Sequence, residues 1–175
     1  MIGKELNPPH QPDPVGVEIR ECTLDVIDVV EGLEYRIFKP SEVYSRGFLE
    51  WLCRECSKTS YLALINGRYA GYVINCIDRP GQGHVVSLGV VPEFRRMGIG
   101  RALLCRSICA LAPMVDKIVL EVRVSNQAAI RLYESLGFKT HHRIPHYYSD
   151  GEDAYFMILE GADLQRASST CRCSP

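Results

Sequence analysis

One stretch carries the strongest structural signal in this sequence: Val90-Val-Pro-Glu-Phe-Arg-Arg-Met-Gly-Ile-Gly-Arg-Ala-Leu-Leu104. An apolar strand ends here in a turn that contains Gly98 and Gly100, and a helix follows. Glycine lets a ligand approach the backbone, and the first N–H groups of a helix are free to bind an anion. Positive charge comes from three arginines in the turn: Arg95, Arg96 and Arg101. The segment therefore predicts a phosphate-binding turn, although it is neither a Walker loop nor a dinucleotide fingerprint.

The segments on either side alternate between strand-like and helix-like patterns. Residues 61–65 and 69–77 are apolar runs joined by Asn66-Gly67, which predicts a β-hairpin. Helices are expected to begin after Thr23, after Ser41, after the glycine turn and at Asn126. Further strands are expected at residues 15–22, 84–91, 117–124, 138–142 and 154–159. The expected fold class is therefore α/β, a single domain with about seven strands in one mixed sheet and about four flanking helices.

Length, charge and hydropathy limit the classes of function. The chain has 175 residues, with 20 Lys and Arg against 21 Asp and Glu, which excludes a polybasic nucleic-acid or membrane-surface protein. Its apolar runs are far shorter than the ~20 residues of a membrane span. We expect a flexible Pro-rich extension at residues 1–14, one domain at 15–161 and a flexible polar tail at 162–175. The N-terminus has no apolar signal segment, so a cytoplasmic location is expected.

The eight cysteines do not follow a spacing that is typical of a metal site. Four lie in apolar segments, where free cysteine packs as a small hydrophobic residue: Cys22, Cys76, Cys105 and Cys109. Of the pairs Cys53/Cys56 and Cys171/Cys173, the second has the wrong spacing for a shared zinc ion and lies in a polar tail. No metal is therefore expected, and a disulfide within either pair is left open.

Three motifs in order resemble one enzyme family. The glycine turn is similar to motif A of the GCN5-related N-acetyltransferase (GNAT) superfamily, Gln/Arg-x-x-Gly-x-Gly/Ala. The run LEVRVSNQAAIRLYESLGF, residues 120–138, resembles motif B of the protein N-terminal acetyltransferases. The run YYSDGEDAY, residues 147–155, is similar to one in NatA-type catalytic subunits and their archaeal relatives. The chain is identified on these motifs, over about residues 17–159, as a member of this superfamily.

The resemblance implies that acetyl-CoA is the co-substrate and that no metal is required. In the family the sheet splays at the acetyl-CoA site, the turn holds the pyrophosphate, and the preceding strand pairs with the pantetheine arm. Matched to this sequence, the cofactor-binding residues are Leu88, Gly89, Val90, Arg95, Arg96, Met97, Gly98, Ile99, Gly100, Arg101, Asn126 and Tyr133. From the residues alone, Asn126 and Tyr133 also fit the first turn and the core stripe of an amphipathic helix.

The resemblance also implies three catalytic residues. His84 and Glu121 match a histidine and a glutamate that can take the amine proton through a water, and Tyr133 matches a tyrosine that serves the leaving thiolate. A free α-amine has a pKa of roughly 7.7–8.0, so modest base catalysis suffices. The alternatives are that His84 is an ordinary residue at the start of a strand and that Glu121 pairs with Arg123 or with another residue of the sheet.

Four residues are implied to hold a substrate N-terminus: Glu42, Tyr44, Tyr147 and Tyr148. The family has Leu-Pro-Glu-Asn-Tyr in its first interhelical loop, whereas this chain has Phe38-Lys-Pro-Ser-Glu-Val-Tyr44. One residue is inserted after Pro40, and Val43 stands where the family has Asn, so the choice of substrate is the property most affected. The alternatives are that residues 40–42 merely start a helix and that the two later tyrosines are exposed aromatics of a hairpin.

The expected function is transfer of acetyl from acetyl-CoA to protein or peptide N-termini by direct attack in a ternary complex. Ribosomal proteins and nascent chains are candidate substrates, and an auxiliary subunit is left open, with no nucleic-acid or membrane partner. One alternative is a GNAT enzyme that acetylates lysine side chains or a small-molecule amine. Another is a CoA-binding subunit that does not catalyse transfer.

Overall fold

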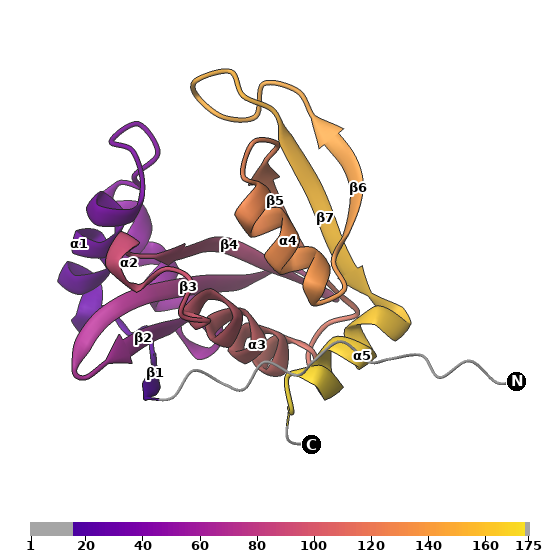
Figure 1. Ribbon diagram of the computed structural model, residues 1–175, viewed down its shortest axis with the longest axis horizontal. Helices are drawn as coiled ribbons and strands as arrows, with labels where there is room; N and C mark the ends of the chain where they lie inside the picture. Colours follow the sequence, from indigo (N-terminus) through magenta and orange to yellow (C-terminus); the bar gives the residue numbers. More distant parts are fainter. Residues whose placement is uncertain (1–15, 174–175) are drawn as a thin grey trace, which may run out of the picture.

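Within residues 16–173, which the computed structural model describes, seven strands form one mixed sheet in the order β1-β2-β3-β4-β5-β7-β6 (Figure 1). The predicted extension at residues 1–14 lies outside the described residues. The strands are β1 Val17–Glu21, β2 Tyr61–Ile65, β3 Arg68–Arg79, β4 Gln82–Val90, β5 Lys117–Arg123, β6 Lys139–Ile144 and β7 Ala154–Glu160. The helices are α1 Ile27–Ile37, α2 Arg46–Glu55, α3 Ile99–Leu111, α4 Gln127–Ser135 and α5 Gly161–Thr170, with short 3₁₀ turns η1 Leu24–Val26, η2 Ser57–Thr59 and η3 Pro92–Phe94. The predicted α/β class is confirmed.

The β2–β3 hairpin contains the two-residue turn that the sequence predicts. Asn66 and Gly67 have φ angles of 49° and 74°, the left-handed conformation that Asn-Gly adopts readily. Neighbouring strands run antiparallel except for β4 and β5, which are parallel. A parallel pair needs a crossover connection, and α3 provides it.

Helices cover both faces of the sheet. Successive residues of a strand point to opposite faces, so β2 shows how the core divides. Tyr61 and Ala63 join one buried cluster with Leu103 of α3, whereas Leu62 and Leu64 join a second cluster with α1 and α2. Every residue of β2 is buried, and the strand is apolar throughout because neither face is exposed to water.

The central strands β4 and β5 part after a short paired region. Residues 82–84 of β4 pair with residues 117–119 of β5, and the pairing ends there. Both strands nevertheless continue, β4 to Val90 and β5 to Arg123. Figure 1 shows the two strands diverging, so the sheet opens through its middle. Beyond His84, the backbone groups of β4 that face β5 are not used by the sheet.

Helix α2 begins later than the sequence predicts. Ser45, not Ser41, is the N-cap, and its side chain accepts a hydrogen bond from Phe48 N at 3.4 Å. Tyr44, the residue before Ser45, is held close to α1, because its backbone N–H donates to Oε2 of Glu34 in that helix at 3.0 Å. This contact with a buried carboxylate outweighs the local helix-start signal at Ser41.

The C-terminal residues do not form the flexible tail that the polar composition predicts. Helix α5 buries Leu164 and Ala167, which lie three positions apart on one helix face, against the core. Two disulfides join the end of the chain to α3, where free thiols were expected: Cys105–Cys171 and Cys109–Cys173. Within the described residues five α-helices therefore flank the sheet, rather than about four.

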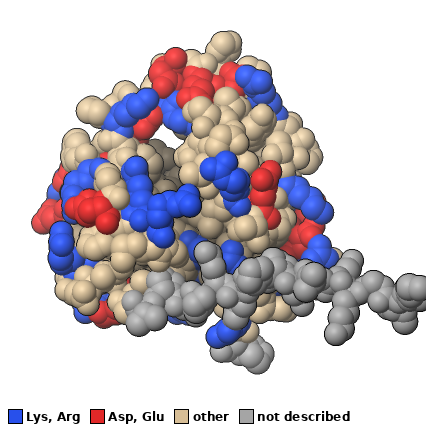
Figure 2. Space-filling view, viewed as in Figure 1, with Lys and Arg blue, Asp and Glu red and all other residues tan. Residues whose placement is uncertain are grey.

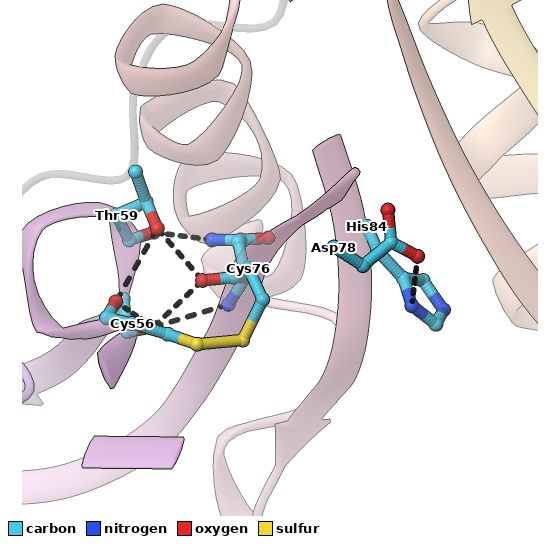
Figure 3. Close-up of a disulfide and its surroundings, with 7 residues drawn as sticks. Cys56, Thr59, Cys76, Asp78 and His84 are labelled. Atoms are coloured by element: carbon cyan, nitrogen blue, oxygen red, sulfur yellow. Dashed lines mark hydrogen bonds and ion pairs between the residues drawn. A yellow bond between two sulfur atoms is a disulfide. The ribbon is translucent and has the colours of Figure 1, made fainter. Parts of the chain in front are cut away.

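The remaining cysteines also depart from the expectation. Cys76 of β3, expected as a free buried thiol, forms a disulfide with Cys56 at the end of α2 (Figure 3). Cys53 lies one helical turn before Cys56 and stays reduced, so no bridge forms within the Cys53/Cys56 pair. The Sγ atom of Cys53 lies 3.5 Å from Sγ of Cys22, which is also buried and reduced. These partners are far apart in sequence, so spacing could not reveal them.

Two further findings concern residues 16–173. No helix in that range is long and apolar enough to cross a membrane. Nor does that range hold three or more His, Cys, Asp or Glu side chains grouped so that they could bind a metal ion. Two ionisable side chains, His84 and Glu121, meet at the opening between β4 and β5.

Replacing Cys171 and Cys173 with serine is expected to lower thermal stability. The two bridges span 66 and 64 residues, and closing a loop of that length restricts the unfolded chain by about 4 kcal/mol. Because the two loops nearly coincide, we expect about this value for the pair, or a Tm lower by roughly 10 °C in calorimetry. Reductant should lower the Tm of the wild-type chain more than that of the variant. Equal responses to reductant would contradict the role of these bridges.

Candidate functional site

A histidine and a glutamate meet where β4 and β5 part. His84 is the last residue of β4 to pair with β5, opposite Val119, and Glu121 lies two residues further along β5. His84 Nε2 and Glu121 Oε2 are 2.7 Å apart. Their side chains are only 22% and 16% exposed, so the pair is shielded from bulk water. The fold thus brings together the two residues that the sequence predicts as the base.

Burial and neighbouring charges act in opposite directions on His84. Burial alone would lower the pKa of the imidazole, because a buried cation is poorly solvated. The hydrogen bond to Glu121 and the charges of Glu121 and Asp78 favour the cation, while Arg79 disfavours it. The net result is a pKa above the usual histidine value. The imidazole therefore binds a proton more readily than free histidine does, as a general base requires.

The glycine turn leads into α3 as predicted. Gly98 is the N-cap with a φ of 81°, and no side chain caps the helix. Arg95, Arg96 and Met97 lie exposed around the turn, whereas Ile99 is buried in the core. Figure 2 shows Lys and Arg side chains gathered beside a hollow on this face. Exposed guanidinium groups and an uncapped helix N-terminus together can hold an anion.

The start of α3 also packs against α4. A Cβ at Gly100 would lie 3.4 Å from the Leu132 side chain of α4. Arg101 Nη1 donates to Ser135 Oγ, also on α4, at 3.1 Å, and Arg95 Nε donates to the last carbonyl of β4 at 3.0 Å. Arg101 therefore connects the two helices, a role that the sequence pattern does not indicate.

Beyond His84, strand β4 offers unpaired backbone to the opening. Leu88, Gly89 and Val90 pair with β3 on one side, and β5 provides no partner on the other. A Cβ at Gly89 would lie 2.8 Å from the Ile37 side chain, so glycine lets α1 pack closely on this strand. A free strand edge of this kind can bind an extended ligand through main-chain hydrogen bonds.

Helix α4 positions two predicted site residues. Asn126 is its N-cap, and its Oδ1 accepts a hydrogen bond from Ala129 N at 3.2 Å. That oxygen caps the first turn of the helix, which fits the alternative that Asn126 belongs to the helix start. Tyr133 is 7% exposed, and its ring centre lies 5.8 Å from that of Phe138. Burial raises the pKa of Tyr133, so its hydroxyl stays protonated at neutral pH and is able to donate a proton or hydrogen bond.

Arg123 connects the two loops that flank the opening. Its Nη2 pairs with Glu42 of the α1–α2 loop. Its Nη1 lies 3.0 Å from Asp150 Oδ1 and 2.8 Å from Glu152 Oε2, both in the β6–β7 loop. The guanidinium is largely buried, with 14% of the side chain exposed. The alternative that paired Arg123 with Glu121 is wrong, because these three carboxylates surround it instead.

The three tyrosines predicted to hold substrate surround the Glu121 carboxylate. Burial, followed by the charge of Glu121, raises the pKa of Tyr147 to about 12. Burial is also the main cause of the raised pKa of Tyr44 and of Tyr148, with a smaller effect of Glu121. The Tyr148 ring centre lies 3.9 Å from the guanidinium carbon of Arg123. The phenols therefore remain neutral hydrogen-bonding groups around the base.

A buried carboxylate that the sequence analysis missed fixes the same opening. Glu34 of α1 has no exposed surface, and it accepts hydrogen bonds from Tyr44 N and from Tyr72 OH. The Tyr72 hydroxyl also lies 2.7 Å from Ser87 Oγ on β4. Burial raises the pKa of Glu34, against the effect of these hydrogen bonds. Glu34 lies next to Leu33 on the buried side of α1. A charged residue among the apolar residues of that helix face was the sequence signal that could have indicated its role.

The comparisons with known proteins agree with this geometry. Residues 26–138 match the acetyltransferase (GNAT) family. An N-alpha-acetyltransferase of Sulfurisphaera tokodaii is 37% identical over 152 residues, which cover 79% of this chain and 90% of that protein. The crystal structure of Ard1 from Thermoplasma volcanium has a TM-score of 0.75 at 28% identity, covering 82% of this chain and 97% of that one. The ribosomal-protein-S18-alanine N-acetyltransferase from Escherichia coli has a TM-score of 0.74 at 31% identity, covering 82% and 93%.

Replacing Arg123 with glutamine is expected to loosen both loops. Three carboxylates would lose their shared cation, and breaking a largely buried ion pair costs about 3 kcal/mol in unfolding free energy. Hydrogen exchange should accelerate in residues 38–45 and 145–153, and urea unfolding should report the lost stability. Arg143→Gln is the matched control, because Arg143 pairs with Asp153 in the same hairpin but is 59% exposed. Equal effects of the two variants would contradict a special role for Arg123.

Proposed function

The chain belongs to the acetyltransferase (GNAT) family, and we propose that it is a protein N-terminal α-amine acetyltransferase that uses acetyl-CoA. The observation that carries this proposal is the His84–Glu121 pair, with 2.7 Å between the two side chains at the opening of the sheet. In this proposal the pair is the base, and the unpaired edge of β4 and the turn at Gly98 form the acetyl-CoA site. Similarity to an N-alpha-acetyltransferase over most of both chains supports the same activity.

The residues predicted to hold acetyl-CoA suit its chemistry. The turn at Gly98, with the exposed Arg95 and Arg96, would take the pyrophosphate charge. The unpaired edge at Leu88–Val90 would take the amide groups of the pantetheine arm. When bound, acetyl-CoA supplies an activated acetyl group as a thioester.

The mechanism proposed for this site is direct transfer. The α-ammonium of the substrate gives a proton, through a water, to the pair formed by Glu121 and His84. The free amine attacks the thioester carbonyl carbon, a C–N bond forms and the C–S bond breaks. The nitrogen then loses a second proton to become the amide, and this proton balances the one that the CoA thiolate gains. Tyr133, kept protonated by burial, donates a proton or hydrogen bond to the departing thiolate sulfur. No covalent enzyme intermediate is needed, because the amine is itself a good nucleophile once it is neutral.

Lysine side chains are the less favoured substrates. Their amines have a pKa of roughly 10.4, so far less of the neutral nucleophile is present than for an α-amine. Arg123 also ties the α1–α2 loop to the β6–β7 loop across the opening, which favours a slot for a chain end. Small-molecule acetylation and CoA binding without turnover are outcomes that the assay below distinguishes.

The finer assignments are part of the same proposal. The Escherichia coli enzyme named above acts on a ribosomal protein, and ribosomal proteins or nascent chains are suitable candidate substrates here too. An auxiliary subunit could alter the substrate loops. We propose cytoplasmic action, because nascent and mature protein N-termini and acetyl-CoA meet there.

The test of the proposal is a transfer assay with labelled acetyl-CoA and short peptides. The panel begins with Ser, Ala, Met-Leu or Met-Glu, and each peptide has an α-blocked partner with an internal Lys. Label is expected on free α-amines only, since the base needs to remove a proton of low pKa. Mass spectrometry of the products locates the acetyl group.

Label on the blocked peptides would reassign the enzyme to lysine acetylation. An absence of label throughout, while calorimetry still detects bound CoA, would favour a small-molecule substrate or a non-catalytic subunit. Loss of CoA binding as well would contradict the family function of the glycine turn.

The variants Glu121→Gln and His84→Ala are expected to lower kcat by about 10- to 100-fold, because each removes half of the proton-accepting pair. The Kd for CoA should stay unchanged, since neither residue belongs to the turn or to the Leu88–Val90 edge. The double variant should be hardly worse than either single variant, as expected for groups that act as a unit. Full turnover in both single variants would show that the base lies elsewhere.

A further inference from the structure

We propose that Asp78 is a positioning residue for the base: its carboxylate holds Nδ1 of the His84 ring, while Glu121 contacts Nε2. The imidazole then lies between two carboxylates. The inference rests on the proposed function and extends it by one residue. Asp78 belongs neither to the motifs of the sequence nor to the predicted site. Its carboxylate Oδ2 lies 3.5 Å from His84 Nδ1 (Figure 3), whereas Glu121 contacts the other ring nitrogen, Nε2.

The register of the β3–β4 hairpin places Asp78 near His84. Cys76 of β3 pairs with His84, and Asp78 lies two residues further along β3, so regular alternation puts it on the same face of the sheet. Ile77 pairs with Gly83 and Arg79 pairs with Gln82, so Asp78 is also the extra residue of a β-bulge.

A buried amide holds the carboxylate in place. Gln82 is 6% exposed, and its Nε2 lies 3.1 Å from Asp78 Oδ1 and 3.3 Å from Oδ2. Gln82 is also the first residue of β4 to pair with β5, so the amide is fixed by the sheet. Asp78 is therefore oriented by its place on β3 and by the Gln82 amide, before any substrate binds.

The chemical consequence concerns the charge of His84. Each ring nitrogen has a carboxylate beside it, Asp78 at Nδ1 and Glu121 at Nε2, so both contacts favour the ring that carries a proton on each nitrogen. When the amine proton arrives, its bond to the amine breaks and a bond to the pair forms. The resulting imidazolium lies between two carboxylates. Asp78 thereby stabilises the protonated base without touching the substrate.

The charges around His84 act with defined signs. Glu121 from β5 and Asp78 from β3 raise the pKa of the imidazole, Arg79 from β3 lowers it, and burial also lowers it. The phenols near Glu121 stay neutral, as described above. Removing the Asp78 charge should therefore lower the pKa of His84, and removing the Arg79 charge should raise it.

The experiment compares Asp78→Asn with Arg79→Gln in the full chain. NMR titration of the His84 ring, assigned by its loss in His84→Ala, reports the pKa without any turnover. The pH profile of kcat/KM with the best peptide reports the working base. Asp78→Asn should move the acidic limb to lower pH and reduce the plateau about three- to tenfold, because a weaker base accepts the proton less well.

Arg79→Gln should move the limb in the opposite direction, and Asp78→Glu should restore part of the plateau. A His84 titration in Asp78→Asn that matches the wild type would overturn the inference. So would a shifted titration with an unchanged plateau. If no peptide is acetylated but the His84 titration still shifts, the proposed function fails and the contact between Asp78 and His84 stands. Equal Tm values for the variants and the wild type would show that a lost plateau does not reflect unfolding.

Discussion

The short parallel contact between β4 and β5 is the constraint on which the site depends. Pairing over residues 82–84 and 117–119 joins the two halves of the sheet, and its end at His84 opens them. A longer contact would use the backbone edge of β4 and close the opening. A missing contact would leave His84 and Glu121 without a fixed separation. The pair of His84 and Glu121 thus lies where the pairing of β4 and β5 ends and the sheet opens.

Strand β5 carries the polar residues Glu121 and Arg123 on one of its faces. Val119 pairs with His84, Glu121 lies two residues further on, and Arg123 two residues beyond that. Because alternate residues share a face, these side chains form a row from the sheet to the loops. Glu121 contacts His84, and Arg123 pairs with carboxylates from both loops. The strand therefore fixes the distance between the proton acceptor and the wall of the slot.

The sequence predicted the elements whose signals are local. Asn66-Gly67 predicted the hairpin and Gly98 the start of α3, whereas the approach of His84 to Glu121 was expected only from the resemblance to the GNAT superfamily. The features that the sequence did not predict depend on contacts between residues that are far apart in the chain. Nothing near Ser41 shows that Glu34 holds the following loop, and nothing near Cys76 points to Cys56. The bulge at Asp78 was equally hidden, because it exists only in the register between two strands.

The loop around Glu42 shows how the departure from the family pattern is accommodated. The extra residue after Pro40 lengthens the loop, yet Glu42 still reaches Arg123 on the opposite side of the opening. Its other carboxylate oxygen accepts a hydrogen bond from Lys39 N at 3.2 Å. Both oxygens are thus engaged within the protein, and the charge is already balanced by a guanidinium. Glu42 therefore joins the α1–α2 loop to β5 through Arg123, and its contact with a substrate N-terminus stays a prediction.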